Sequence, residues 1–202
     1  MNPWRTVAIV LCVASLASCA KEEGAEEQQP RVESRSDKKL QGQWVSSCAD
    51  AMMFGNSQRS EIKISEDSII RTTFVSTSGN CGDTSVEVLQ VGSLELGETN
   101  RLGARKVDIG VRTVSVRPVS ELGVSILNAG TGFCGYKNWR VGVEKNVTRA
   151  TGNERCYEKT PKLFYDIYSL EDDKLFFGEG EAARDESLRP AVIDRNDVYS
   201  RK

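Results

Sequence analysis

The residues of this chain that could do chemistry are cysteines, serine–lysine pairs and clustered carboxylates, because its 202 residues include no histidine. Without an imidazole the chain lacks the usual general base at neutral pH, the Ser-His-Asp and Cys-His nucleophiles, and the commonest ligand of catalytic zinc. The composition therefore argues against an enzyme. We expect no catalytic residue and no cofactor.

Two strings match catalytic or nucleotide-binding motifs, but neither has the required context. Residues 130–135 read G-x-G-x-x-G; a dinucleotide site needs a strand before this motif and a helix after it, and the expected order here is reversed. Ser60 and Lys63 have the S-x-x-K spacing, but they lie in an expected strand, where positions i and i+3 face opposite sides. We interpret both strings as structural.

Clustered carboxylates are the remaining chemical feature. They occur at Glu171, Asp172 and Asp173, and at Asp194 with Asp197. Such groups could bind calcium or form a glycosidase pair. Neither cluster follows the EF-hand pattern, and the tips of hairpins are commonly acidic because they are solvated. We therefore predict no metal site.

The N-terminal segment predicts export. Met1–Arg5 carries one charged side chain, and residues 6–17 form an apolar run too short to span a bilayer. Residues 16–19, Leu-Ala-Ser-Cys, resemble the lipobox of bacterial lipoproteins. The resemblance implies a signal peptide over residues 1–18, diacylglycerol on the Cys19 sulfur and a further acyl chain on its new amino group. Two or more chains anchor a protein stably.

The anchor implies a place in the cell envelope. Ala20 rather than Asp follows Cys19, which favours the outer membrane over the inner. Residues 20–39 are charged and nearly free of large apolar side chains, so we predict a disordered tether over residues 19–39. Residues 40–202 are then one domain. Its charges of both signs are interspersed without a basic face, so we expect no nucleic-acid partner.

Four cysteines remain in the domain: Cys48, Cys81, Cys134 and Cys156. An even number in an oxidising compartment predicts two disulfides, and none of the spacings is C-x-x-C. Three connectivities are possible. We favour Cys48–Cys81 with Cys134–Cys156, because each pair closes a local loop.

Most of the domain reads as strands separated by turns. Alternating apolar residues predict strands over residues 43–47, 61–65, 68–77, 86–96, 107–116, 139–143, 164–170 and 175–178. The alternation changes phase between Val111 and Val114, which predicts a bulge near Arg112 and Thr113. Val119, Leu122 and Ile126 have helical spacing, so we expect one short helix over residues 119–128.

This pattern favours an all-β fold, either an antiparallel up-and-down barrel of about eight strands or a β-sandwich. Leu40-Gln-Gly42-Gln-Trp44 is similar to the L-x-G-x-W start of lipocalins and lipocalin-like bacterial lipoproteins. Residues 165–178 resemble their late hairpin. The resemblance implies the barrel, with a late arginine, Arg195 or Arg201, packed over Trp44.

We therefore expect a membrane-anchored, non-enzymatic module that binds a small apolar ligand or an envelope component. The candidate binding surface is the loop that carries Phe133, Tyr136 and Trp139, since a disulfide at Cys134 would stiffen it. These aromatic residues could instead cap the barrel core. The alternative functions are an inhibitor of a wall-degrading enzyme and a structural or surface interaction protein.

Overall fold

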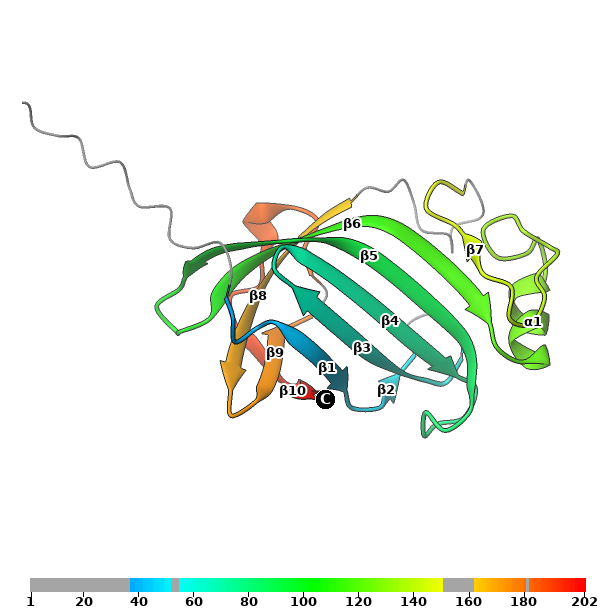
Figure 1. The fold of residues 1–202 in the computed structure, drawn as a ribbon, viewed down its shortest axis with the longest axis horizontal. Coiled ribbons are helices and arrows are strands. Elements are labelled where there is room, and N and C mark those ends of the chain that lie inside the picture. Colours follow the sequence, from blue (N-terminus) through cyan, green and yellow to red (C-terminus); the bar gives the residue numbers. More distant parts are fainter. Residues whose placement is uncertain (1–36, 52–54, 151–161, 181) are drawn as a thin grey trace, which may run out of the picture. The chain divides into compact units, whose positions relative to one another are not determined.

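The computed structural model describes residues 37–51, 55–150, 162–180 and 182–202. These residues form ten strands, one α-helix and one short 3-10 helix (Figure 1). In chain order they are β1 (Gly42–Ser46), β2 (Ala49–Asp50), β3 (Ser57–Ser65), β4 (Ser68–Ser76), β5 (Thr84–Thr99), β6 (Arg105–Pro118), α1 (Glu121–Asn128), β7 (Lys145–Asn146), β8 (Lys162–Glu171), β9 (Lys174–Gly178), the 3-10 helix Glu186–Leu188 and β10 (Ile193–Arg201).

Eight of the strands close into an antiparallel barrel. The neighbours run β1-β10-β9-β8-β6-β5-β4-β3, and β1 pairs again with β3 to complete the ring. The two-residue strands β2 and β7 extend this ring at β3 and β6. The prediction of an all-β barrel of about eight strands with one short helix is confirmed, and the alternative of a β-sandwich is not the fold.

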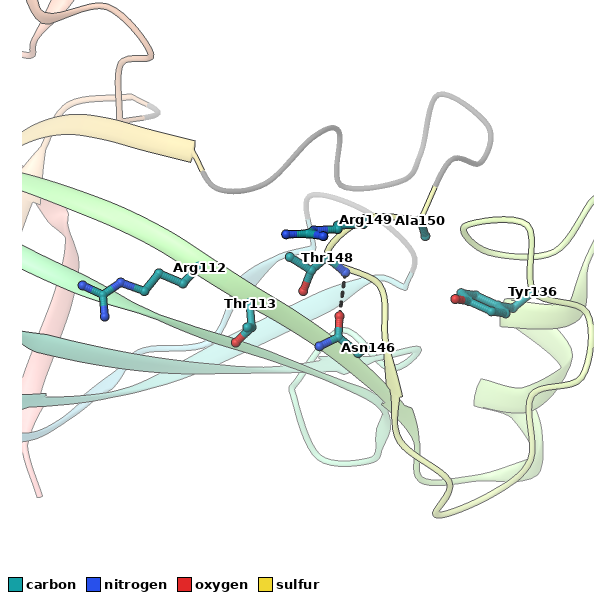
Figure 2. A pocket seen from close by; sticks show the side chains of 7 residues that line it. All are labelled: Arg112, Thr113, Tyr136, Asn146, Thr148, Arg149 and Ala150. Atoms are coloured by element: carbon teal, nitrogen blue, oxygen red, sulfur yellow. Dashed lines mark hydrogen bonds between the residues drawn. The ribbon is translucent and has the colours of Figure 1, made fainter.

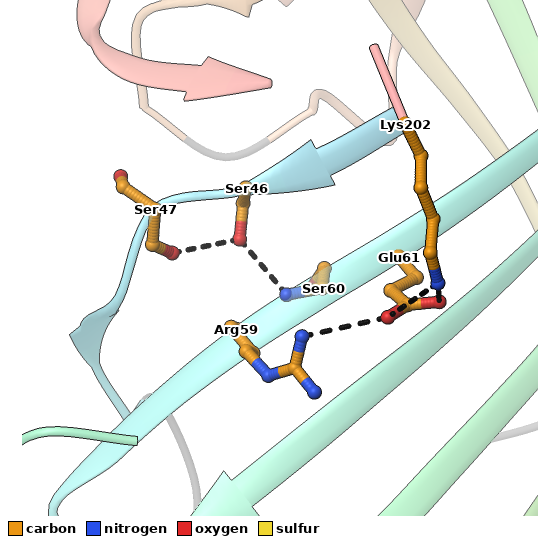
Figure 3. A network of polar contacts seen from close by, with 6 residues as sticks. All are labelled: Ser46, Ser47, Arg59, Ser60, Glu61 and Lys202. Carbon is orange, nitrogen blue, oxygen red and sulfur yellow. Dashed lines mark hydrogen bonds and ion pairs between the residues drawn. The ribbon is translucent and has the colours of Figure 1, made fainter. Parts of the chain in front are cut away.

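The ring closes at a seam between β1 and β3, where Trp44 pairs with Ile62. Polar contacts tie the two strands: the Ser60 N–H donates to Ser46 Oγ at 2.8 Å (Figure 3). Lys202, directly after β10, places its Nζ 3.2 Å from a carboxylate oxygen of Glu61. The last residue of the chain is thereby joined to the third strand.

Two apolar clusters account for the buried core. The first gathers around β1 and contains Leu40, Trp44, Ile62, Ile64, Ile69, Leu94, Leu96, Val107, Tyr168, Leu175, Phe177 and Tyr199. The second gathers toward α1 and contains Val75, Val86, Val88, Val111, Val114, Val116, Leu127, Phe133, Cys134, Trp139 and Val147. We refer to these two ends of the barrel as the Trp44 end and the α1 end.

The Trp44 end is closed by a plug of Trp44, Leu40 and Arg201. The Trp44 indole N–H donates to the Leu40 carbonyl at 2.8 Å, and the Arg201 guanidinium lies 4.2 Å from the centre of the indole ring. Gly42 has φ of 132°, and a Cβ there would come within 2.7 Å of Arg201 Nη1. Of the two arginines implied by the resemblance, the one over Trp44 is therefore Arg201. Arg195 instead lies over Phe176 and pairs with Glu171.

The chain enters the barrel earlier than the predicted domain start. Asp37 accepts a hydrogen bond from the Tyr168 hydroxyl at 3.0 Å, and the Lys39 carbonyl accepts one from Arg201 at 2.6 Å. Residues 37–39, assigned from sequence to the tether, thus contact the barrel. The predicted signal peptide, Cys19 and the rest of the tether lie outside the described residues.

The late hairpin and the helix lie close to their predicted positions. β8 and β9 flank the acidic turn at Asp172 and Asp173. The helix begins after Ser120, whose Oγ accepts a hydrogen bond from the Gly123 N–H at 3.1 Å. Within the described residues, no helix has the length and apolar character needed to cross a membrane.

The apolar spacing that predicts the helix does not show which of its residues are buried. Leu122 is 51% exposed, and the buried positions are Gly123 and Leu127. A Cβ on Gly123 would lie only 2.0 Å from the Ser85 carbonyl oxygen, so α1 lies almost directly on the β5 backbone at this glycine. Spacing of large side chains cannot reveal a contact that depends on the absence of one.

The predicted strand over residues 139–143 is wrong. This segment is a turn in which the Gly142 N–H donates to the Pro118 carbonyl at 2.8 Å, with φ of 75° at Gly142. Trp139 is buried, whereas Val141 and Val143 are exposed. Their alternation comes from a turn held against α1 and not from a sheet.

One disulfide is described, between Cys48 and Cys81, and it confirms the predicted pair. It joins the segment after β1 to the turn between β4 and β5. Cys134 is also disulfide-bonded. Its predicted partner, Cys156, lies outside the described residues, so that pairing stays a prediction.

Candidate functional site

The aromatic surface proposed from sequence is largely part of the core. Phe133 and Trp139 are buried in the α1-end cluster, with ring centres 6.3 Å apart. Tyr136 packs edge-on against Trp139 at 5.9 Å and is 37% exposed. Of the three residues, only Tyr136 is presented to solvent, so Phe133 and Trp139 act as a cap on the core.

The predicted bulge in β6 lies at a second candidate for a binding site. Thr113 pairs with Val91 and Val111 pairs with Gly92, which leaves Arg112 as the extra residue. An extra residue twists a strand locally and re-aims its side chains. The phase change in the sequence therefore located a real irregularity, and it lies at an arginine.

At the same position, the other edge of β6 has a gap in its pairing with neighbouring strands. β8 pairs with β6 only as far as Val111, and β7 pairs with it from Ser115 onward. Between them, the Val114 N–H donates to Thr148 Oγ1 at 2.9 Å. Arg112 and Thr113 therefore have no strand partner on this edge within the described part of the chain.

A pocket of about 380 Å³ opens at this gap. We call it the bulge pocket, and it is lined by Arg112, Thr113, Tyr136, Asn146, Thr148, Arg149 and Ala150. In Figure 2, β6 contributes Arg112 and Thr113, the segment after β7 contributes Thr148 and Arg149, and Tyr136 approaches from the far side. The two guanidinium groups extend in the same direction in this view.

A local turn positions Arg149 at the pocket. Asn146 Oδ1 accepts the Thr148 N–H at 2.9 Å, and the Val147 N–H donates to the Val114 carbonyl at 2.8 Å. The hydroxyl of Thr148 is already engaged with Val114, so its role is structural. The arginine follows directly after this fixed turn.

Among the described lining residues, the charge of the bulge pocket is uncompensated. Arg112 and Arg149 are the only charged residues of this described lining, and both are exposed. In the part of the chain that the structure describes, neither guanidinium makes a hydrogen bond or an ion pair. Two arginines without a carboxylate suit a phosphate or carboxylate ligand, which guanidinium groups bind in bidentate geometry.

A third cation lies beside the pocket. Lys145 Nζ is 5.1 Å from the centre of the Tyr136 ring and 4.8 Å from that of Trp139. Burial lowers the pKa of Lys145, and the positive charge of Arg140 lowers it further. The surroundings of Tyr136 are therefore basic, which adds to the attraction for an anion.

A second group of polar side chains faces the barrel interior. This interior polar group consists of Ser60, Arg71, Thr73, Asp166 and Tyr199, which lie on the same face of their strands as core residues. Burial raises the pKa of Asp166 to about 6, against the opposing effect of backbone N–H donors and of Arg71 and Arg189. Arg71 Nε is buried and has no hydrogen-bond partner among the described residues. The group contains both signs of charge, so it does not select an anion.

The remaining sequence motifs are structural here. Ser60 is buried and Lys63 is exposed, so their side chains do not meet. Glu171 and Asp173 form ion pairs with Arg195 and Arg201. Among the described residues, no three histidine, cysteine or acidic side chains cluster in a way that could hold a metal ion.

Most of the pocket could not be predicted from the sequence. The bulge is visible there, whereas Asn146, Thr148 and Arg149 reach β6 through the two-residue strand β7. Such a short strand has no detectable alternation. No protein-family model matches this chain, and neither does any curated protein.

Proposed function

We propose that this chain is a lipid-anchored lipoprotein of the bacterial envelope that acts as a non-enzymatic binding module. Its ligand is an envelope component that places an anionic group in the bulge pocket. The observation that carries this proposal is a pocket with two arginines that have no partner among the described residues, and with no carboxylate in its described lining.

The shape of the site supports binding rather than catalysis. The described lining residues include no cysteine and no acid that could serve as nucleophile or general base. The pocket also lies on rigid supports, because Arg112 belongs to a barrel strand and Arg149 follows a hydrogen-bonded turn. The backbone that carries both arginines therefore does not need to reorganise when an anion binds.

The proposed location in the cell envelope rests on the sequence. The resemblance of residues 16–19 to a lipobox supports lipidation at Cys19, and Ala20 supports the outer membrane. We also propose kinship with the lipocalin-like lipoproteins. What supports it is the closed eight-stranded barrel together with the early Trp44 under the late Arg201.

The proposal can be tested with the mature chain, residues 19–202, carrying Cys19→Ser so that no anchor is attached. We expect glycerol 3-phosphate to shift the side-chain Nε–Hε signals of Arg112 and Arg149 in a saturable way in ¹H–¹⁵N NMR spectra. Added salt should weaken the binding, because it screens exposed charges. Glycerol, which has the same backbone without the phosphate, should cause no saturable shift.

The double variant Arg112→Gln with Arg149→Gln should weaken glycerol 3-phosphate binding by about tenfold or more, which corresponds to about 1.4 kcal/mol. Arg101 is a matched control, since it is exposed in the hairpin at the Trp44 end. Arg101→Gln should leave binding unchanged. Equal binding by the double variant and the parent would rule out the bulge pocket as the anion site.

A further inference from the structure

Exposed apolar side chains gather at the α1 end. Eight large hydrophobic residues are exposed in the described part of the chain, and four of them lie in α1 or in the loop after it. They are Leu122, Tyr136, Val141 and Val143. Single exposed apolar residues are ordinary, whereas several in one short region indicate an interaction surface.

The aliphatic members of this set belong to two segments that are joined by a backbone hydrogen bond. The hydrogen bond from the Gly142 N–H to the Pro118 carbonyl places the turn with Val141 and Val143 beside the start of α1. Leu122 lies in the first turn of that helix. We call Leu122, Val141 and Val143 the aliphatic face.

Two further hydrogen bonds fix the loop that carries Val141 and Val143. The side chain of Asn128 at the end of α1 accepts the Trp139 N–H at 3.0 Å and donates to the Trp139 carbonyl at 3.2 Å. The loop is thus fixed to both ends of the helix, and its buried Trp139 secures it to the core. An exposed apolar surface that is held in this way does not need to reorganise in order to bind.

The charges around the face are positive on balance. Residues 119–150 contain four lysines and arginines against two glutamates, in a chain whose net charge is −2. Lys137 and Arg140 are exposed in the same loop as Val141 and Val143. The acids are Glu121 and Glu144. The negative charge of Glu144 also raises the pKa of Arg117, although the largest cause of that shift is the hydrogen bond between Arg117 and Glu87.

We propose that the α1 end docks on the surface of an anionic lipid bilayer. The aliphatic face enters the headgroup layer, while Lys137 and Arg140 approach the lipid phosphates. Apolar insertion together with attraction to anionic lipids is the usual basis of such binding. This interaction goes beyond the binding of an anion in the bulge pocket and does not depend on it.

The proposed anchor permits this contact. Residues 19–36 lie between Cys19 and the first described residue, and 18 residues can reach at most about 60 Å. The longest strand, β5, has 16 residues and therefore spans about 50 Å. A barrel lying along the membrane can thus bring its α1 end to the bilayer that holds the lipid on Cys19.

The test uses the mature chain with Cys19→Ser and vesicles of phosphatidylcholine alone or mixed equally with phosphatidylglycerol. We expect flotation with the anionic vesicles only, and a loss of binding in high salt. The triple variant Leu122→Ser, Val141→Ser and Val143→Ser should bind about tenfold less. All three side chains are exposed, so the fold should tolerate these changes.

Leu102 and Leu188 provide the matched control, being exposed outside the α1 end. Leu102→Ser with Leu188→Ser should leave vesicle binding unchanged, whereas Lys137→Glu with Arg140→Glu should weaken it by about tenfold. The proposal is overturned if anionic vesicles do not bind, or if the triple variant and the control lose binding equally. It is also overturned if the parent forms a dimer that the triple variant abolishes, since a second copy would then cover the face.

The outcomes separate the two proposals. Binding of glycerol 3-phosphate without binding of vesicles would leave the pocket as an anion site and remove the docking surface. Binding of vesicles without binding of glycerol 3-phosphate would do the reverse. Arg112→Gln with Arg149→Gln should abolish the phosphate-induced NMR shifts but retain most of the vesicle binding.

Discussion

The two ends of the barrel use arginine differently. At the Trp44 end, Arg201 lies over an indole ring, donates to two backbone carbonyls and pairs with Asp173. At the α1 end, Arg112 and Arg149 line a pocket without a partner among the described residues. Arg201 is held by structural contacts at the Trp44 end, whereas Arg112 and Arg149 remain able to bind a ligand. We therefore place binding at the α1 end.

The largest expected loss of stability follows from removing the Cys48–Cys81 disulfide. Cys48–Cys81 closes a loop of 33 residues, and removing it by Cys48→Ser with Cys81→Ser should lower the free energy of unfolding by about 3–4 kcal/mol. Urea denaturation measures this loss. Hydrogen exchange of the most protected amides, which follows global unfolding, should quicken in proportion to this loss. Unchanged exchange of those amides and an unchanged urea midpoint would contradict the prediction.

Exchanging arginine for methionine at each end tests the contrast directly. Arg201→Met should destabilise the chain by about 2–3 kcal/mol, because it removes charge-assisted hydrogen bonds and the contact with Trp44. Arg149→Met should change stability by less than about 0.5 kcal/mol. The midpoints of thermal or urea unfolding compare the two variants. Similar losses at both positions would mean that Arg149 is structural and not held for a ligand.

Asp166 lies within the barrel and gives a prediction about pH. Its side chain is only 6% exposed, and burial raises its pKa from 3.8 to about 6. Because the folded state binds this proton more tightly, the contribution to stability is full below pH 4 and is lost as the pH rises through about 6. The expected loss between pH 4.5 and 7.5 is about 2 kcal/mol.

Asp166→Asn isolates this contribution. The amide oxygen of asparagine can still accept the N–H groups of Ile167 and Gly178, which Asp166 binds at 2.8 and 3.1 Å. The difference in unfolding free energy between the variant and the parent should grow in favour of the variant from pH 4.5 to 7.5. A difference that stays constant over this range would show that Asp166 does not titrate there.

The barrel was predictable because alternation is a local signal. The hairpin of β8 and β9, the position of α1 and the bulge at Arg112 all follow from the spacing of apolar residues. The orientation of α1 was not predictable, because it depends on Gly123 meeting the β5 backbone. The turn at Val141 and Val143 has the alternation of a strand, and only its hydrogen bonds to α1 and Pro118 distinguish it.

The candidate site was predictable only in part for the same reason. The bulge is visible in the sequence, whereas Arg149 reaches it from 37 positions later through a contact of two residues. Aromatic residues in a glycine-rich loop suggested a surface, yet Phe133 and Trp139 are buried. An exposed aromatic side chain and a core aromatic side chain have the same sequence pattern when the loop folds back on a helix.

The smallest expected effect separates the two buried tryptophans. The Trp44 indole N–H donates to Leu40, whereas the Trp139 indole N–H is buried without a hydrogen-bond partner among the described residues. Phenylalanine leaves a similar void at both sites, but at Trp44 it also leaves the Leu40 carbonyl unpaired, while at Trp139 it removes an unsatisfied donor. Trp44→Phe should therefore destabilise the chain by about 1–2 kcal/mol more than Trp139→Phe. Urea unfolding of the two variants measures the difference. Equal losses would mean that the Trp139 N–H has a partner, such as bound water, and that the α1 end is as fully satisfied as the Trp44 end.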